Sequence, residues 1–192
     1  MMRLAYLSLK WQAMGWLVLG RQAQALAVFD ELLQLWPDDE YGLSSRAHLH
    51  AQAGRLEQAL ADNERWVQVA ADNANAWFNR GYLLESLERY EEALASFVRA
   101  TELSPKLDRA WYGQGLVLIR LERYDEAVAA LKRNTELQPM SPYGWYQLAR
   151  VHVDRRNPEE AVKIIRHLKG FEPKVAAQLE RETGLLSGAP TP

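Results

Sequence analysis

Small and apolar side chains recur along this 192-residue chain at a fixed interval of 34 residues. The interval is clearest for alanine, which returns at Ala25, Ala59, Ala93, Ala127 and Ala161. Apolar residues lie three or four positions from these alanines, a spacing that predicts an amphipathic helix with one buried stripe. A period of this length predicts a repeated unit of two helices.

Tryptophan and proline follow the same interval, at Trp77, Trp111, Trp145, Pro105, Pro139 and Pro173. Five units of equal length without insertion therefore fit the chain. We predict a repeat domain over residues 1–175, with units at 6–39, 40–73, 74–107, 108–141 and 142–175. Residues 176–186 continue the register as a polar-backed capping helix, because an open array must cover its last apolar face. Residues 187–192 are expected to form a flexible tail.

The third unit has its recurring residues at Trp77, Gly81, Leu84, Ala93, Phe97, Ala100 and Pro105. This pattern resembles the tetratricopeptide repeat (TPR) family. The resemblance covers residues 6–175 and is weakest in the second unit, where Ala71 replaces the proline. It implies an all-α fold, a right-handed α-solenoid of antiparallel helix pairs whose first helices line a concave face.

Four residues depart from the repeat pattern. Asn63 and Asn134 stand where an apolar or small residue is usual, and an alternative for both is an amide that faces a neighbouring loop carbonyl. Glu88 and Glu122 replace the usual turn glycine. We expect a more helical conformation at those two turns.

The composition removes several classes of function. The formal net charge is -2 and no long run of like charges occurs, which argues against nucleic-acid binding. The chain has no cysteine, so it has neither a disulfide nor a thiolate metal site. Its four histidines lack metal-ligand spacing, and no phosphate-binding loop or nucleophile elbow is present. We therefore expect no enzyme activity, no cofactor and no metal.

The N-terminus allows two interpretations. An apolar stretch follows Met1, Met2 and Arg3, and a cleaved secretion signal is one alternative. Lys10 and Gln12 interrupt that stretch, which is too short to span a membrane. Because it lies in repeat register, we interpret it as the first repeat. A cytoplasmic location is favoured over a secreted or periplasmic one.

The resemblance also indicates where a ligand would bind, because first-helix positions form the concave groove of such repeats. The candidate groove residues are Tyr41, Asn75, Phe78, Asn79, Tyr82, Arg109, Tyr112, Tyr143, Tyr146 and Arg150. Tyrosine is favoured at recognition surfaces, although single tyrosines could instead pack on the next unit. The carboxylate clamp of co-chaperones and the asparagine ladder of sugar-nucleotide transferases are both absent. We expect a protein partner, bound through a peptide or helix with apolar anchors.

The first unit presents a second candidate surface. It has apolar side chains that its own second helix need not cover, at Leu7, Trp11, Met14, Leu17 and Val18. Tolerated exposure is one interpretation, and a contact with a second copy or another protein is the other. Two alternative functions therefore remain: a self-assembling scaffold joined through this patch, and a secretion or assembly chaperone built from the same repeats.

Overall fold

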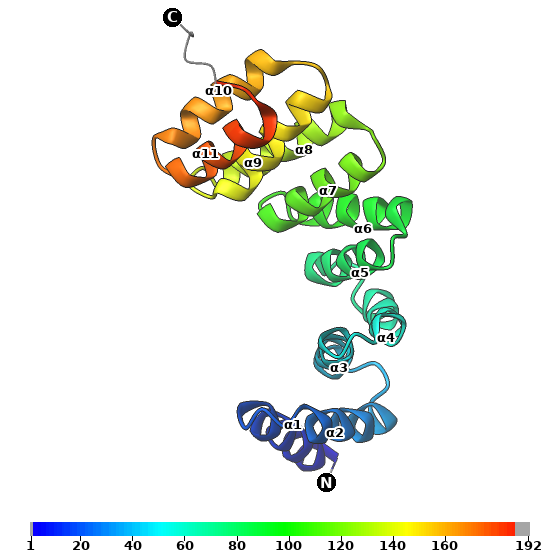
Figure 1. The fold of residues 1–192 in the computed structure, drawn as a ribbon. Helices are drawn as coiled ribbons and strands as arrows, with labels where there is room; N and C mark the ends of the chain where they lie inside the picture. Colours follow the sequence, from blue (N-terminus) through cyan, green and yellow to red (C-terminus); the bar gives the residue numbers. More distant parts are fainter. Residues whose placement is uncertain (1, 187–192) are drawn as a thin grey trace, which may run out of the picture. The chain divides into compact units, whose positions relative to one another are not determined.

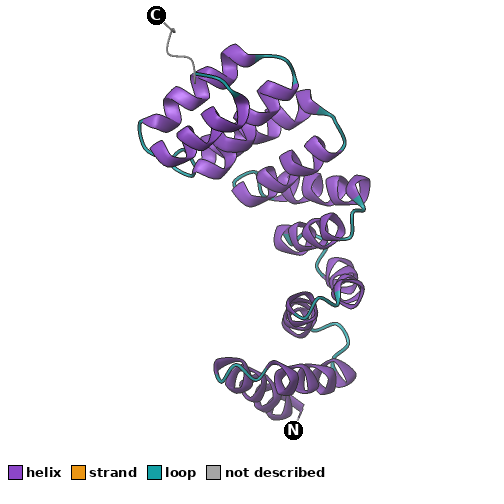
Figure 2. Cartoon of the chain, viewed as in Figure 1, coloured by secondary structure: helices purple, strands orange, loops and turns teal. Residues whose placement is uncertain are grey.

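The computed structural model describes residues 2–186, and every regular element within them is an α-helix (Figures 1 and 2). Eleven helices follow one another in this described part, joined by short turns. In chain order they are α1 (Met2–Val18), α2 (Gln22–Leu35), α3 (Glu40–Gln52), α4 (Leu56–Val69), α5 (Ala74–Ser86), α6 (Tyr90–Leu103), α7 (Asp108–Arg120), α8 (Tyr124–Leu137), α9 (Pro142–Asp154), α10 (Pro158–Lys169) and α11 (Pro173–Thr183). The expected all-α solenoid of tandem helix pairs is confirmed.

The helices belong to two compact units, Met1–Arg89 with α1–α5 and Tyr90–Pro192 with α6–α11. In the N-terminal unit each helix packs on the next one along the chain. The C-terminal unit follows the same rule, and there α9 also contacts α7 and α11. The first helices of successive repeats therefore lie beside one another in that unit.

Small residues occupy the places where helices cross. The five repeated alanines are fully buried, at Ala25, Ala59, Ala93, Ala127 and Ala161. Gly115 shows the reason, because a Cβ atom added there would lie 2.7 Å from the side chain of Leu131 on the paired helix. A larger residue would force the two helices apart, at a cost of about 1–3 kcal/mol.

The recurring tryptophans link each first helix to the loop before it. The indole Nε1 of Trp77 donates a hydrogen bond to the carbonyl oxygen six residues earlier, at 2.8 Å. Trp111 and Trp145 do the same at 3.0 and 2.9 Å. The indole thus packs its apolar body while its one donor is satisfied, which fixes the start of the helix against the loop.

The turn inside each repeat has one residue in the left-handed region, again at an interval of 34. These residues are Gly20, Gly54, Glu88, Glu122 and Arg156, with φ of 69°, 73°, 60°, 58° and 57°. The expectation of a helical conformation at Glu88 and Glu122 is wrong. The following amide returns to a carbonyl five residues back, as from Arg89 to Leu84 at 2.8 Å, and this closure requires a left-handed residue.

The two unusual asparagines behave differently. Asn134 donates from Nδ2 to the carbonyl oxygen of Asp108 at 2.9 Å, as the loop-carbonyl alternative anticipates. Asn63 is fully buried and neither atom of its amide has a hydrogen-bond partner, so that alternative is wrong for Asn63.

The expected capping helix corresponds to α11, which begins at Pro173 and ends at Thr183 rather than spanning 176–186. Its end is set by Gly184, whose φ of 69° takes the chain out of the helix. Ala176 and Leu179 are its buried residues, which agrees with a helix that covers the array on one face. The predicted tail, 187–192, lies outside the described residues. Across residues 2–186 no helix has the length and apolarity needed to cross a membrane.

Candidate functional site

The C-terminal unit contains an open hollow of about 490 Å³, formed mainly by α7, α9 and α11. We call it the tyrosine hollow. Its lining consists of three aromatic rings, two small apolar side chains and three polar groups. These residues are Tyr112, Tyr143, Tyr146, Pro142, Val175, Gln147, Glu172 and Gln178.

Three of the predicted groove residues meet in this hollow. Tyr112 and Tyr146 occupy the same position in successive repeats, so α7 and α9 present them on the same side. Both are half-buried, whereas Tyr143 is 69% exposed. Such rings offer apolar area together with a polar tip, the combination typical of recognition surfaces. The hollow is therefore suited to an apolar side chain on a hydrogen-bonding backbone.

A charged network lies at the edge of the hollow. The Tyr146 hydroxyl donates to Glu182 Oε2 at 2.5 Å, and Gln178 Nε2 donates to Glu182 Oε1 at 2.8 Å. Arg150 lies one turn further along α9, with its Nη1 3.5 Å from the Tyr146 hydroxyl and its guanidinium carbon 5.8 Å from the ring centroid. The hydrogen bonds from Tyr146 and Gln178 lower the pKa of Glu182, and the charge of Arg150 adds to this effect. Burial and the bond to Glu182 raise the pKa of Tyr146.

The other predicted groove residues lie elsewhere. Arg109 is exposed on α7 but does not line the tyrosine hollow. Tyr41, in the N-terminal unit, packs edge-to-face on Phe29 with centroids 5.8 Å apart, and Lys10 Nζ stands 4.3 Å from its ring. Tyr41 therefore takes part in packing between α1, α2 and α3.

Four further predicted residues share a stripe of α5, also in the N-terminal unit: Asn75, Phe78, Asn79 and Tyr82. Tyr82 is 54% exposed, and Phe78 and Asn79 are half-buried. The backbone amide of Asn75 donates to the side chain of Asn73 at 3.0 Å, the N-cap of α5. The stripe lies on the surface of the N-terminal unit, and its contact with a partner stays a prediction.

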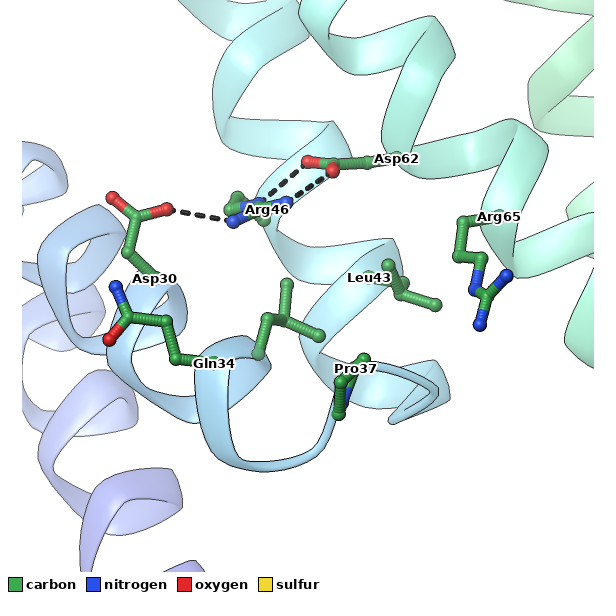
Figure 3. A pocket seen from close by; sticks show the side chains of 8 residues that line it. Asp30, Gln34, Pro37, Leu43, Arg46, Asp62 and Arg65 are labelled. Atoms are coloured by element: carbon green, nitrogen blue, oxygen red, sulfur yellow. Dashed lines mark hydrogen bonds and ion pairs between the residues drawn. The ribbon is translucent and has the colours of Figure 1, made fainter.

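A second hollow, of about 470 Å³, lies between α2, α3 and α4 (Figure 3). We call it the Arg46 pocket. At its base Arg46 donates from Nε and Nη2 to Asp62, at 2.8 and 2.5 Å, and from Nη1 to Asp30 at 2.9 Å. Arg65 on α4 also lines the pocket, and it pairs with Asp38 in the loop before α3. The three helices are thereby joined by one ion network.

Sequence reasoning missed this network. The third repeat keeps part of it, an Arg80–Glu64 contact at 3.4 Å, but has Ser96 where Asp62 would stand. The available signal was the pair Asp62–Asn63, polar residues at buried positions of the second helix in the repeat that matches its pattern least. Buried carboxylates require a cation, and Arg46 directly precedes the crossing residue Ala47 on the paired helix.

The predicted apolar patch lies on α1. Its five members are all exposed: Leu7, Trp11, Met14, Leu17 and Val18. Leu4 and Leu19 extend it, with exposed fractions of 74% and 68%. Leu9 and Ala13 face the other way and are buried in the core of the unit. The helix is therefore apolar on both sides, which a single packed face does not explain.

The histidines of the described residues are not grouped with two or more other metal ligands, and two of them are covered by packing. No group of three or more histidines, cysteines, aspartates and glutamates is placed to hold a metal ion within residues 2–186. His152 is buried at a packing position, and His50 is largely covered with its Nε2 3.9 Å from Asp62. Burial lowers the pKa of both imidazoles. They act as packing residues in place of Leu84 and Leu118 of the other repeats.

Comparison with family models gives matches described as tetratricopeptide repeat. One covers residues 74–107, and a second model covers 99–142 and 112–171. No curated protein matches the sequence significantly.

Solved structures share the fold at low sequence identity. A crystal structure of MamA is 18% identical, with a TM-score of 0.80 over 97% of this chain and 98% of that one. MamA residues 41-end from Desulfovibrio magneticus RS-1 are 19% identical, with a TM-score of 0.79 over 92% and 96%. YrrB, described as a TPR protein with an unusual peptide-binding site, is 20% identical, with a TM-score of 0.78 over 88% of both chains.

Proposed function

This chain belongs to the tetratricopeptide repeat family, and we propose that it is a non-catalytic scaffold that binds an extended segment of another protein in the tyrosine hollow. The family supports a role in protein–protein interaction. The observation that carries the finer proposal is the convergence of Tyr112, Tyr143 and Tyr146 around one open space.

The shape and chemistry of the hollow favour an extended peptide. About 490 Å³ holds one or two side chains but not a packed domain face. Tyrosine rings bind proline and other apolar side chains through their faces, while the Tyr143 hydroxyl and the amide of Gln147 reach the peptide backbone. Two χ angles per ring keep the entropic cost of binding low. The description of YrrB as peptide-binding supports the same mode by analogy of fold.

The proposal is tested by selection from a phage-displayed library of random dodecapeptides on the purified chain. Selected peptides are made synthetically and their affinity is measured by fluorescence anisotropy. Tyr143→Ala is the first variant, because a side chain that is 69% exposed contributes little to folding. Loss of a central aromatic anchor costs about 2 kcal/mol, and we therefore expect a fall in affinity of about thirtyfold.

The matched control is Met140→Ala, which removes an equally exposed large side chain, 68%, in the loop just before α9. It does not line the tyrosine hollow and should leave the affinity unchanged. Circular dichroism verifies that both variants keep the helical fold. Failure to select any peptide, or peptides that bind Tyr143→Ala as tightly as the parent chain, would refute the proposal.

Self-association through α1 is a second candidate function, favoured by the exposure of 68% of Trp11 and 86% of Val18 on one helix. Contiguous apolar exposure of this kind marks an interaction surface. Light scattering of the parent chain should give a mass above one chain, and Trp11→Glu should return it to a monomer. Gln12→Glu adds the same charge at a neighbouring exposed position and should not. A monomeric parent chain would end this idea.

A further inference from the structure

The edge of the tyrosine hollow already holds a carboxylate, which belongs to the chain itself. Glu182, in the last turn of α11, accepts hydrogen bonds from Tyr146 on α9 and from Gln178 on its own helix. Two of these three residues, Tyr146 and Gln178, also line the hollow. The carboxylate therefore sits where a ligand in the hollow would extend.

The groups around Glu182 form a set that recognises an anion. The Tyr146 hydroxyl and the Gln178 amide are neutral donors, and Arg150 adds a positive charge one helical turn away. Arg181 beside Glu182 contributes in the same direction, whereas Asp154 near Arg150 and Glu172 in the lining of the hollow are opposing charges. An ionised carboxylate accepts from several donors at once, which is how Glu182 is held.

A ligand can displace Glu182 from these hydrogen bonds. The Glu182 side chain is exposed, and its hydrogen bonds with Tyr146 and Gln178 are accessible to solvent. Exposed charged contacts of this kind are weak because water competes for both partners. When Glu182 leaves, the Tyr146 hydroxyl, the Gln178 amide and the Arg150 guanidinium are all left to bind another acceptor.

We infer that Glu182 is a built-in competitor for an acidic side chain of the bound partner. Tyr146 and Arg150 form the acidic subsite of the tyrosine hollow, and the partner segment carries a glutamate or aspartate next to the apolar anchor in the rings. Binding displaces Glu182, so the capping helix lowers the affinity of the hollow for its own ligand. This inference rests on the proposed function and specifies the chemistry of its partner.

The opposite interpretation is that Glu182 itself recruits a lysine or arginine of the partner. Both of its carboxylate oxygens already accept hydrogen bonds, and the charges of Arg150 and Arg181 that act on it are positive. A partner cation would have to approach Glu182 against these two positive charges. The charge beside Glu182 thus favours an incoming carboxylate, and peptides with a glutamate or a lysine distinguish an acidic from a basic partner.

Two phage-displayed dodecapeptide libraries serve as probes, one with glutamate and one with lysine fixed at the central position and the other positions random. Each is selected on the parent chain, and the best peptides are synthesised with and without the fixed charge. For glutamate peptides we expect Glu182→Ala to raise the affinity at least fivefold and Arg150→Gln to lower it about tenfold. The same peptides with glutamine at the fixed position should respond to neither variant.

Glu159→Ala is the charge-matched control, an exposed glutamate on α10 that does not line the hollow. Glu182→Gln, which keeps the shape and removes the charge, checks that any gain comes from the lost carboxylate. Peptides that depend on Tyr143 but ignore Glu182→Ala would overturn the inference and leave the proposed function standing. Lysine peptides weakened by Glu182→Ala would overturn it as well, and failure of both libraries would refute the proposed function together with the inference.

Discussion

Replacing Arg46 by methionine should destabilise the N-terminal unit by about 3 kcal/mol. Three guanidinium hydrogen bonds are lost, two to Asp62 and one to Asp30. The side chain of Asp62 is only 9% exposed, so its charge is left buried without a cation. Breaking such a pair costs about 3–5 kcal/mol, and the 24% exposure of the Arg46 side chain places this case at the lower end. Asp30, which is half exposed, can turn to water and adds little.

The measurement is urea unfolding followed by far-UV circular dichroism, combined with hydrogen exchange of α3 and α4, because helical arrays do not always unfold in a single step. Arg65→Met is the internal control. Its partner is Asp38 and both side chains are about half exposed, so the loss should stay below about 1 kcal/mol. The double variant Arg46→Met, Asp62→Leu should recover most of the stability, because it removes the stranded charge and fills the space with apolar atoms.

A second readout follows from the neighbouring imidazole. Burial is the main cause of the lowered pKa of His50; Asp62 acts in the opposite direction, and the charges of Arg55 and Arg46 lower the pKa further. Arg46→Met should therefore raise the pKa of His50, which NMR titration measures. Equal losses of stability in Arg46→Met and Arg65→Met, together with an unchanged His50, would show that the network has no buried character.

Two further predictions concern single buried polar groups. Asn63→Leu should stabilise the chain by about 1–3 kcal/mol, measured by urea unfolding, because neither atom of this buried amide has a hydrogen-bond partner. The matching residues of the other repeats are apolar. A loss of stability in this variant would contradict the absence of a partner for the amide. Burial lowers the pKa of His152 from 6.5, so below this pH the unfolded chain binds a proton that the folded chain does not. The stability present above pH 6.5 is therefore lost as the pH falls through that value. His152→Leu should reduce this loss of stability between pH 7 and pH 5, and an unchanged dependence of the unfolding free energy on pH would contradict the assignment.

The repeat fold was predictable because its determinants are steric and periodic. Residues such as Ala93 and Gly115 must be small because two helices cross at these positions. The same crossing occurs once in every repeat, so the small residues recur at the length of the repeat. The meeting of Tyr112 and Tyr146 follows from the same interval, since equal positions of successive first helices project to the same side. Spacing alone therefore contains the tyrosine part of the candidate site.

The rest depends on geometry that spacing does not contain. The left-handed conformation at Glu88 is imposed by the hydrogen bond from Arg89 to Leu84, which closes the helix whatever the side chain. The contact of Glu182 with Tyr146 spans 36 residues and depends on where α11 ends. Arg46 likewise reaches Asp62 only because two helices place their side chains at the same depth. Such pairings depend on how the helices pack in three dimensions, which the spacing of residues along the chain does not contain.

The Arg46 network and the tyrosine hollow occur in different units, so a change in the network can alter stability without altering the binding site. Asn63, Asp62 and His50 all lie on the two helices of the second repeat, in the N-terminal unit. Packing in each unit runs mainly between consecutive helices, so a change there acts first on α3 and α4 and the helices that contact them. The hollow is built by α7, α9 and α11, whose packing partners belong to the C-terminal unit. Loss of the Arg46 network should therefore lower stability while leaving peptide affinity intact, because the groups that bind the peptide gain none of their order from α3 or α4.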